Sequence, residues 1–229
     1  MLITAYDKLH ISMQNDEVKK YIAVLSKRKT QILIKRILDI FICGLIFIIT
    51  LPIFLIIAFC IKITSKGPVF FKQMRVGKDM KEFAILKFRT MVADADKKGV
   101  QLTTGDDKRI TGFGKILRKT NLDEMPQLIN VIKGDMSIVG TRPEVKRYVD
   151  CYTDEMYATL LLEPGMLSNA SVKYKDENSL LSEAGNPVEV YINKILPDKM
   201  KYILEYLSEV SILTDIKIIG RSIACMFKK

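Results

Sequence analysis

Two adjacent carboxylates are the residues whose position in this sequence most directly suggests chemistry. Asp123 and Glu124 come just before Pro126, in the run from Asn121 to Leu128. Proline has no amide donor, so it fits the first turn of a helix, and the two acids are expected at that helix's N-terminus. The helix dipole favours ionised carboxylates there. The pair could bind Mg²⁺ or act as a nucleophile; alternatively, Asp123 only caps the helix and Glu124 favours its first turn.

Basic side chains that could hold phosphate groups punctuate several apolar or small-residue stretches. They are Lys87 and Arg89 in LKFRTM, Arg118 in ILRKT and Arg142 in VGTRPE. Arg142 stands between a Gly-Thr pair and Pro143, which predicts a stiff loop suited to bidentate capture of phosphate oxygens. Each cation taken singly could equally be a surface or salt-bridge residue. The sequence contains neither a Walker phosphate loop nor a dinucleotide-binding fingerprint.

Cysteine and histidine usage excludes several other chemistries. The four cysteines, at positions 43, 60, 151 and 225, have no metal-ligand spacing, and the single histidine is His10. Zinc chemistry and any histidine-dependent triad are therefore excluded. A disulfide framework is not expected in a chain of 229 residues, so a reducing cytoplasm is the natural compartment.

The elements that must position these residues include one uncharged apolar segment. Apolar residues make up 48% of a chain that is also 27% charged, and the mean hydropathy is +0.13. The segment from Ile40 to Ile61 has no charged residue in 22 positions, enough to cross a hydrocarbon core of ~30 Å as a helix. The remainder of the chain has the length of one globular domain.

Pro52 and the flanking charges favour a segment that dips into the membrane and returns. Pro52 lies near its centre, where a proline removes a backbone hydrogen bond and bends the helix. A spanning helix would have a one-sided charge bias, whereas basic residues flank both ends here. They are Lys35, Arg36, Lys62 and Lys66. The alternative is a transmembrane helix with a tolerated proline. Asp39 is expected to pair with a nearby cation rather than to catalyse.

The rest of the chain predicts a β-hairpin followed by mainly helical structure. Residues 68–91 contain two aromatic-rich apolar runs around Gly77-Lys78-Asp79. After a polar loop, roughly 92–111, two short helices are expected, the second ended by Gly134. The stretch 212–227 is amphipathic, which suits either a membrane surface or packing on the domain.

A basic block follows the apolar segment. Residues 62–119 contain 15 Lys and Arg against 6 Asp and Glu. Such a block could contact anionic lipid, attract a phosphorylated substrate or bind nucleic acid, and a solvated lysine-rich surface is the plainer interpretation. Charge alone does not decide between them.

Several of these stretches, in this order, resemble one protein family. From about Lys35 onward, over roughly 130 residues, the sequence is similar to the monotopic phosphoglycosyl transferases, the bacterial sugar transferase family. The matching stretches are KRILDI, GPVFFKQMRVG, ILKFRTM, ITGFGKILRKTNLDEMPQLINVIKGDMSIVGTRP and EPG. The chain departs from the family at Leu51, often serine, and after Pro164-Gly165, where many members have TGWAQVNG. The second departure leaves the sugar specificity undetermined.

The resemblance implies a catalytic Asp-Glu pair, matched by Asp123 and Glu124, with the aspartate as covalent nucleophile and Mg²⁺ as cofactor. It implies a re-entrant helix bent at a proline, matched by Pro52. The family's functional cations map onto Lys87, Arg118 and Arg142. We assign Asp123 and Glu124 to catalysis and to the metal, the four cations Lys87, Arg89, Arg118 and Arg142 to the substrate, and Pro52 and Pro143 to structure.

The sequence therefore predicts an α+β protein, with a mostly helical cytoplasmic domain, one small β-hairpin, an N-terminal proline-bent re-entrant membrane helix and interfacial amphipathic helices. The expected parts are a cytoplasmic N-terminal extension at 1–34, the membrane helix at 35–66 and the catalytic domain at 67–229. The implied enzyme faces the cytoplasm at the bacterial inner membrane.

The implied reaction transfers a sugar-1-phosphate from a UDP-sugar to polyprenyl (undecaprenyl) phosphate. It releases UMP through an aspartyl-phosphosugar intermediate and initiates a lipid-linked surface glycan such as an exopolysaccharide or capsule. The partners are these two substrates and the cytoplasmic leaflet, without nucleic acid, and a homodimer is one option. In one alternative, Asp123 only ligates Mg²⁺ while the lipid phosphate attacks directly. In another, the chain is a non-catalytic basic membrane anchor, which gives no reason for the Asp-Glu pair and the Arg-Pro loop to occur together.

Overall fold

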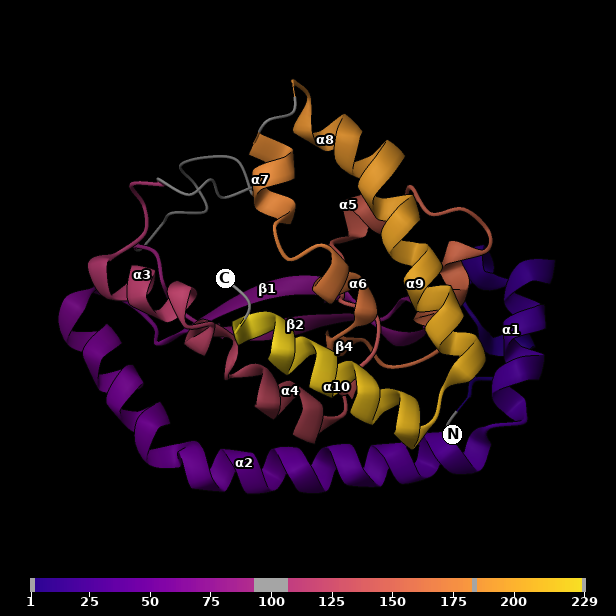
Figure 1. The fold of residues 1–229 in the computed structure, drawn as a ribbon, viewed down its shortest axis with the longest axis horizontal. Helices are drawn as coiled ribbons and strands as arrows, with labels where there is room; N and C mark the ends of the chain where they lie inside the picture. The colour runs from indigo at the N-terminus through magenta and orange to yellow at the C-terminus, as the bar shows by residue number, and fades with distance from the viewer. Residues whose placement is uncertain (1–2, 93–106, 183–184, 228–229) are drawn as a thin grey trace.

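The computed structural model describes residues 3–92, 107–182 and 185–227. The α-helices are α1 Asp16–Ser26, α2 Lys29–Thr64, α3 Gly112–Lys119, α4 Gln127–Lys133, α5 Lys146–Val149, α6 Asn169–Lys173, α7 Glu177–Ser182, α8 Pro187–Val190, α9 Leu196–Glu209 and α10 Ile212–Phe227. The strands are β1 Phe70–Val76, β2 Glu82–Phe88, β3 Ser137–Val139 and β4 Gly165–Leu167. Figure 1 shows α2 along the lower edge of the molecule, with the hairpin and the other helices above it. The predicted mostly helical protein with a small hairpin and one long apolar helix is confirmed.

The predicted hairpin forms from β1 and β2. The strands pair antiparallel over seven residues each, with Phe70 opposite Phe88. In the turn, Asp79 and Met80 have positive φ angles of 53° and 63°. The Thr4 hydroxyl donates a hydrogen bond to the Asp79 carboxylate at 2.5 Å. The N-terminal segment therefore helps to hold a turn whose backbone conformation is costly for residues other than glycine.

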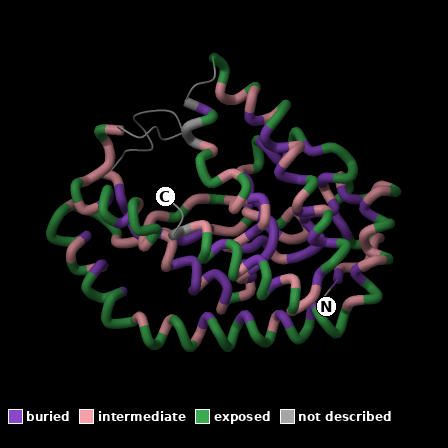
Figure 2. Tube along the Cα trace, in the orientation of Figure 1, coloured by how far each residue is buried: buried purple, intermediate pink, exposed green. Residues whose placement is uncertain are grey.

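Helix α2 is the element that could enter a membrane. Within the described ranges it is the one helix long and apolar enough to cross a bilayer, with 36 residues and Pro52 in its interior. Figure 1 shows α2 running along the lower edge and then turning upward at the left. Its outward face is largely exposed (Figure 2), as expected of a helix that meets lipid. The re-entrant course and a bend at Pro52 stay predictions.

Aromatic side chains attach the C-terminal part of α2 to the hairpin. The ring of Phe54 lies 4.7 Å from that of Phe88 and 5.9 Å from that of Phe70. Leu117 of α3 belongs to the same buried cluster. Burying one such side chain stabilises the fold by about 1.5–3 kcal/mol. The cluster fixes the end of β2, where Lys87 precedes Phe88.

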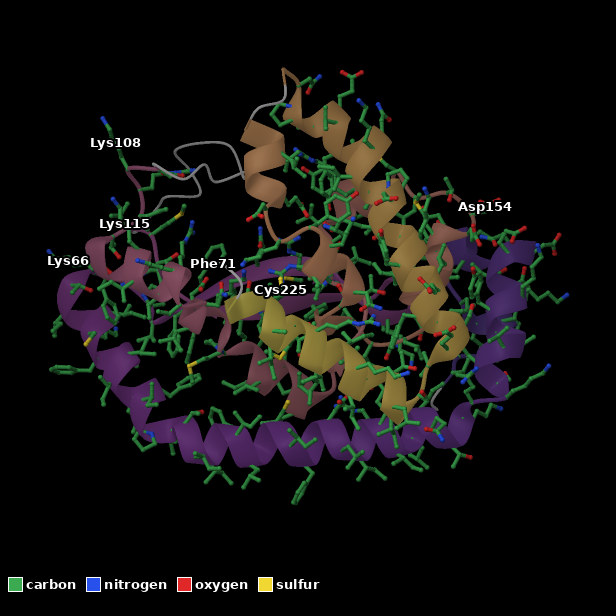
Figure 3. The ribbon with its side chains drawn as sticks, viewed as in Figure 1. Lys66, Phe71, Lys108, Lys115, Asp154 and Cys225 are labelled. Atoms are coloured by element: carbon green, nitrogen blue, oxygen red, sulfur yellow. The ribbon has the colours of Figure 1, made fainter. Side chains whose placement is uncertain are left out.

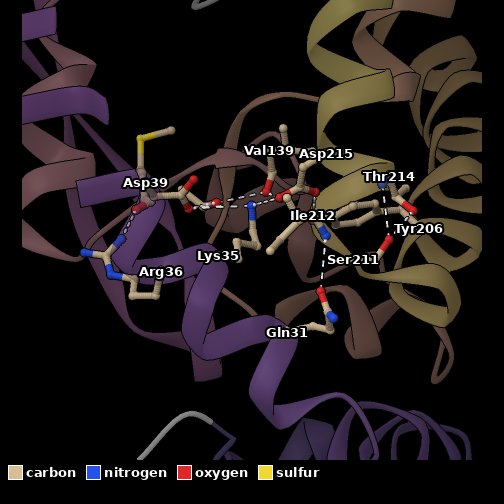
Figure 4. Close-up of polar contacts among 12 residues, drawn as sticks. Gln31, Lys35, Arg36, Asp39, Val139, Tyr206, Ser211, Ile212, Thr214 and Asp215 are labelled. Carbon is tan, nitrogen blue, oxygen red and sulfur yellow. Dashed lines mark hydrogen bonds and ion pairs between the residues drawn. The ribbon is translucent and has the colours of Figure 1, made fainter. Parts of the chain in front are cut away.

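A buried polar network attaches the N-terminal part of α2 to the rest of the chain (Figure 4). The Lys35 ammonium lies 2.6 Å from the Asp215 carboxylate and 3.5 Å from that of Asp39. Ser137 donates to Asp39 at 2.6 Å, and Tyr206 donates to Asp215 at 2.8 Å. The expectation that Asp39 pairs with a nearby cation is confirmed. Because a buried charge without a partner is costly, the network holds α2, β3 and α10 in one arrangement.

The N-terminal segment before α2 packs into the main hydrophobic core. Met13, Val18 and Leu25 have no exposed surface, and α1 contacts α9. The Asn15 side chain caps α1 by accepting a hydrogen bond from the Val18 amide at 2.8 Å. The predicted boundary between residues 34 and 35 falls inside α2.

A short parallel strand pair supports the loop that carries Arg142. Ser137 of β3 lies opposite Gly165 of β4. The backbones of Gly140 and Gly165 approach so closely that a Cβ on Gly165 would lie 2.0 Å from the Gly140 nitrogen. Neither position can carry a side chain without moving the other strand. This contact fixes the chain two residues before Arg142.

Candidate active site

Asp123 and Glu124 lie on a single 3₁₀ turn, Leu122–Glu124, between α3 and α4. Asn121 precedes it in the left-handed region, with φ 56°. The sequence placed both acids in the first turn of the next helix, whereas Pro126 is the residue that caps α4, with no side-chain hydrogen bond to the helix. The alternative in which Asp123 only caps this helix is therefore wrong. Asp123 is buried and Glu124 is half-buried.

Two of the predicted cations converge on Glu124. The Lys87 ammonium donates to Glu124 Oε1 at 2.6 Å, and Arg142 Nη2 donates to the same oxygen at 2.7 Å. Arg142 Nη1 lies 3.5 Å from Oε2. Burial alone would raise the pKa of Glu124, but the charges and hydrogen bonds of Arg142 and Lys87 outweigh it and hold this pKa well below its usual range. Glu124 is therefore ionised.

Asp123 has the opposite electrostatic environment. Burial raises the pKa of Asp123 above its usual value, Lys87 and Arg118 oppose that shift, and the charge of Glu124 adds to it. Within the described residues, no side chain donates a hydrogen bond to the Asp123 carboxylate: Lys87 and Arg142 donate to Glu124, and Arg118 donates to Thr90. The helix dipole was expected to keep Asp123 ionised, but burial and the neighbouring charges determine its pKa instead. Two neighbouring acids with pKa values pushed apart are typical of catalytic sites, although structural ion pairs can have the same effect.

Arg118 approaches the pair from α3. Its Nε donates to the Thr90 hydroxyl at 2.9 Å. Burial lowers the pKa of Arg118, and the charge of Asp123 opposes this shift. A Cβ on Gly114 would lie 2.1 Å from the Thr90 carbonyl oxygen, so α3 can pack this close only with glycine there. The packing fixes Arg118 at Thr90, where its charge acts on Asp123.

Arg89 is not brought together with the other cations. Its Nη2 donates to the Ser65 carbonyl at 2.7 Å and to the Ser65 hydroxyl at 2.8 Å, at the C-terminal end of α2. The residue is buried, and its Nε and Nη1 have no hydrogen-bond partner among the residues that the structure describes. Pro143, which the sequence assigns to structure, accepts a hydrogen bond from Arg75 at 3.3 Å through its backbone carbonyl. Arg89 thus contacts the C-terminal end of α2, and its predicted contact with substrate stays a prediction.

Two buried polar residues of α4, Gln127 and Asn130, were not among the residues predicted from the sequence. Gln127 has no exposed surface, and in the described part of the chain both its amide atoms lack a hydrogen-bond partner. Asn130, on the same buried face, donates to Ala84 and accepts from Leu86 of β2. Gln127 and Asn130 are spaced i, i+3 on a helix whose other buried residues are apolar. This spacing could have marked both residues in the sequence, because a buried amide normally has a hydrogen-bonding role.

The donor set fits a magnesium ion that shares its coordination with substrate. In the described part of the chain, no group of three or more His, Cys, Asp or Glu could hold a metal ion. Mg²⁺ is commonly bound by one or two carboxylates together with substrate phosphates and water. Asp123 and Glu124 supply two carboxylates, and the Asp123 oxygens are not engaged by other side chains. The residues present therefore fit the ion only together with a phosphate ligand.

Positive charge is displayed beside this site. Lys66, Lys108 and Lys115 are exposed and lie at the end of the molecule where α2 turns upward (Figure 3). They belong to the basic block recognised in the sequence. Its location near α3 suits both anionic lipid and a phosphorylated substrate.

Comparison with known proteins gives a consistent result. A family model described as "Bacterial sugar transferase" matches residues 30–229. A Klebsiella pneumoniae protein named UDP-glucose:undecaprenyl-phosphate glucose-1-phosphate transferase is 38% identical over 81% of this chain and 38% of its own length. A Caulobacter vibrioides protein of the same name is 35% identical over 82% of this chain and 68% of its own length.

A third relative has another sugar in its name. An Aeromonas hydrophila UDP-N-acetylgalactosamine-undecaprenyl-phosphate N-acetylgalactosaminephosphotransferase is 43% identical over 54% of this chain and 29% of its own length. The chain thus spans well under half of the Klebsiella and Aeromonas proteins.

Proposed function

Since the chain belongs to the bacterial sugar transferase family, whose family model matches residues 30–229, we propose that it transfers a sugar-1-phosphate from a UDP-sugar to undecaprenyl-type polyprenyl phosphate and releases UMP. The names of the relatives contain this donor class and this acceptor. The observation that carries the proposal to this chain is the carboxylate of Glu124, held by Lys87 and Arg142 beside the buried Asp123.

In the first step, an Asp123 carboxylate oxygen attacks the phosphorus that bears the sugar. A phosphorus–oxygen bond to Asp123 forms while the bond to UMP breaks, and UMP leaves with the electron pair. The raised pKa of Asp123 makes its ionised form more basic, while Lys87 and Arg118 favour that form. The product is an aspartyl-phosphosugar and free UMP.

In the second step, a lipid phosphate oxygen attacks the same phosphorus and displaces Asp123. Both steps bring anions together, so the site must supply positive charge and fixed positions. Lys and Arg side chains have further donors beyond those that contact Glu124. Glu124 therefore orients Lys87 and Arg142 so that their free donors can hold phosphate oxygens. At an effective dielectric constant of about 20, a cation 4 Å from a developing charge contributes up to about 4 kcal/mol.

Asp123 and Glu124 would hold Mg²⁺ together with the donor diphosphate. The bound ion would neutralise charge on the phosphate oxygens and on the departing UMP. Initiation of a surface glycan is the place in metabolism that we propose for this reaction.

We further propose that α2 is embedded in the cytoplasmic leaflet of the bacterial inner membrane, with both ends in the cytoplasm. Its largely exposed apolar surface and the buried attachments at Phe54 and Lys35 support a membrane helix fixed to the catalytic part. The water-soluble donor and the lipid acceptor could then meet at the membrane surface.

A UMP-release assay tests the proposal. The purified full chain is incubated with undecaprenyl phosphate, Mg²⁺ and each of several UDP-sugars. We expect UMP release with at least one donor, dependent on lipid for turnover, and abolished in Asp123→Asn. A folded chain that releases no UMP from any donor, but still binds anionic vesicles, would favour the membrane-anchor alternative.

A further inference from the structure

A polar cavity adjoins the candidate active site on the side away from the long run of α2. Its volume is about 180 Å³. Figure 1 shows α5, α7 and α9, which contribute to its wall, above the β1–β2 hairpin, with α2 below. The cavity is therefore on the part of the molecule that faces water if α2 lies in the membrane. Its wall includes Gln73, Arg75, Glu144, Tyr148, Glu177, Tyr191 and Lys199.

Arg142 belongs to both the cavity and the site. It lines the cavity and holds Glu124 at 2.7 Å. In a nucleotide diphosphate sugar, the sugar is bonded through one oxygen to the phosphorus that Asp123 would attack. A phosphate held by Arg142 would therefore place its sugar within reach of the cavity.

The back wall combines donors and acceptors in one network. The Lys199 ammonium donates to Glu177 at 3.0 Å and to the Tyr191 hydroxyl at 3.3 Å. Tyr191 donates to Glu144 at 2.5 Å. Arg75 Nη2 donates to Gln73 at 2.8 Å, Arg75 Nη1 lies 3.9 Å from Glu144, and within the described ranges the buried Arg75 Nε has no hydrogen-bond partner. Hydroxyl groups, which both donate and accept, suit such a surface better than an apolar group does.

The two tyrosine rings of the wall are buried and already contact neighbouring groups. The rings of Tyr148 and Tyr191 lie 4.6 Å apart. Arg147 lies over the ring of Tyr148 at 4.7 Å, and Lys199 over that of Tyr191 at 5.2 Å. Because both rings are buried, stacking of uracil on either would have to displace one of these contacts. The geometry disfavours the nucleoside as occupant.

The size of the cavity suits a pyranose ring. A cavity of ~150 Å³ is known to hold benzene, and a six-membered sugar ring is of similar size. The wall cations are already paired with carboxylates or amide oxygens, as Lys199 is with Glu177 and Glu144. A neutral sugar would leave these pairs intact, whereas an anionic sugar would meet the carboxylates of Glu144 and Glu177.

We propose that this cavity binds the sugar of the donor and that Glu177, placed by Lys199, selects a neutral, hydroxyl-rich pyranose. The inference rests on the proposed phosphoglycosyl transfer. It assigns sugar choice to α7, η7 (Tyr191–Ile195) and α9, which follow the stretch directly after Gly165 where the chain departs from the family pattern.

The test compares the donor with its own nucleotide product. For the wild type and Glu177→Gln, we would measure kcat/KM with UDP-glucose, UDP-N-acetylglucosamine, UDP-N-acetylgalactosamine and UDP-glucuronate, and the inhibition constant of UMP. Glu205→Gln, an exposed carboxylate on α9, is the matched control. Melting temperatures check that each variant is folded.

We expect kcat/KM for the best neutral donor to fall about 10- to 100-fold in Glu177→Gln, as for loss of a hydrogen bond to a charged group. The inhibition constant of UMP should change by less than about twofold, and discrimination against UDP-glucuronate should decrease. Equal weakening of donor and UMP, or no change in either, would overturn the inference while leaving the proposed reaction standing. A wild type that releases no UMP from any donor would instead overturn the proposed function, and the inference with it.

Discussion

Replacing Arg142 separates a catalytic role for this residue from a structural one. In Arg142→Ala, Glu124 loses its contacts to two guanidinium nitrogens but keeps Lys87 at 2.6 Å. The Arg142 side chain is 39% exposed, and ion pairs with this much solvent contact contribute at most about 1 kcal/mol. A loss of that size lowers the melting temperature of a chain this long by roughly 2–4 °C. The fold should therefore survive.

The expected loss of activity is much larger than the loss of stability. Removing one preorganised donor from a site that stabilises developing negative charge typically lowers kcat by about 100- to 1000-fold. We expect UMP release by Arg142→Ala to fall in this range. Arg142→Lys retains the charge but not the planar fork, so it should recover only part of the activity and remain about tenfold below wild type.

The assay is UMP release with saturating lipid, together with a thermal melt of each variant. Lys146→Ala, which breaks an exposed pair with Asp150 shortly after the same loop, controls for loss of a positive charge and should leave both readouts unchanged. Full activity in Arg142→Lys would refute the bidentate role. A collapsed melting temperature in Arg142→Ala would make the residue structural.

Three further predictions concern the metal, α2 and the attachment of α2. Glu124→Gln should shift the Mg²⁺ titration of activity to about tenfold higher concentration or more; an unchanged titration would remove Glu124 from the metal site. Arg89→Met should lower the melting temperature by several degrees, because it loses buried hydrogen bonds to the end of α2 worth about 1–3 kcal/mol; a variant with unchanged stability and severely reduced kcat would instead place Arg89 at the substrate. The third test uses an impermeant thiol reagent on intact cells, with the other native cysteines replaced. The reagent should label neither Ala5→Cys nor native Cys151, whereas Pro52→Leu should expose position 5 in some molecules. Labelling of position 5 with Pro52 present would mean that α2 spans the membrane.

The local elements could be predicted because their signals are local. The hairpin follows from aromatic-rich runs around a turn, and α2 from an uncharged apolar stretch. Asp123 and Glu124 were recognisable as a candidate pair. Their different environments were not, because the pKa of Glu124 depends on Lys87 and Arg142 and that of Asp123 on burial, Lys87 and Arg118, and these effects arise from segments that meet only in the folded chain.

Lys87 and Arg89 illustrate where sequence reasoning ends. Two residues apart, they would point the same way if the strand continued. However, β2 ends at Phe88, and Arg89 contacts Ser65 instead of the acids. The end of the strand depends on the packing of Phe54 on Phe88, a contact between segments that no local pattern announces.

The polar cavity next to Arg142 could not be predicted from the sequence for the same reason. Glu144, Glu177, Tyr191 and Lys199 are spread over 56 positions and meet only when α7, η7 and α9 come together with the loop that carries Glu144. Of these four, only Glu144, beside the Arg-Pro pair, lies in a stretch whose sequence suggested chemistry. Their juxtaposition is a tertiary property.

Intact-protein mass spectrometry tests the covalent step most directly. The full chain is mixed with the best UDP-sugar and Mg²⁺ without lipid acceptor, and the protein is digested to locate any adduct. We predict one phosphosugar on Asp123, discharged when undecaprenyl phosphate is added, and neither adduct nor turnover in Asp123→Asn. Normal turnover without an adduct, or an Asp123→Asn variant that stays active once deamidation is excluded, would contradict Asp123 as the nucleophile and leave it as a metal ligand only.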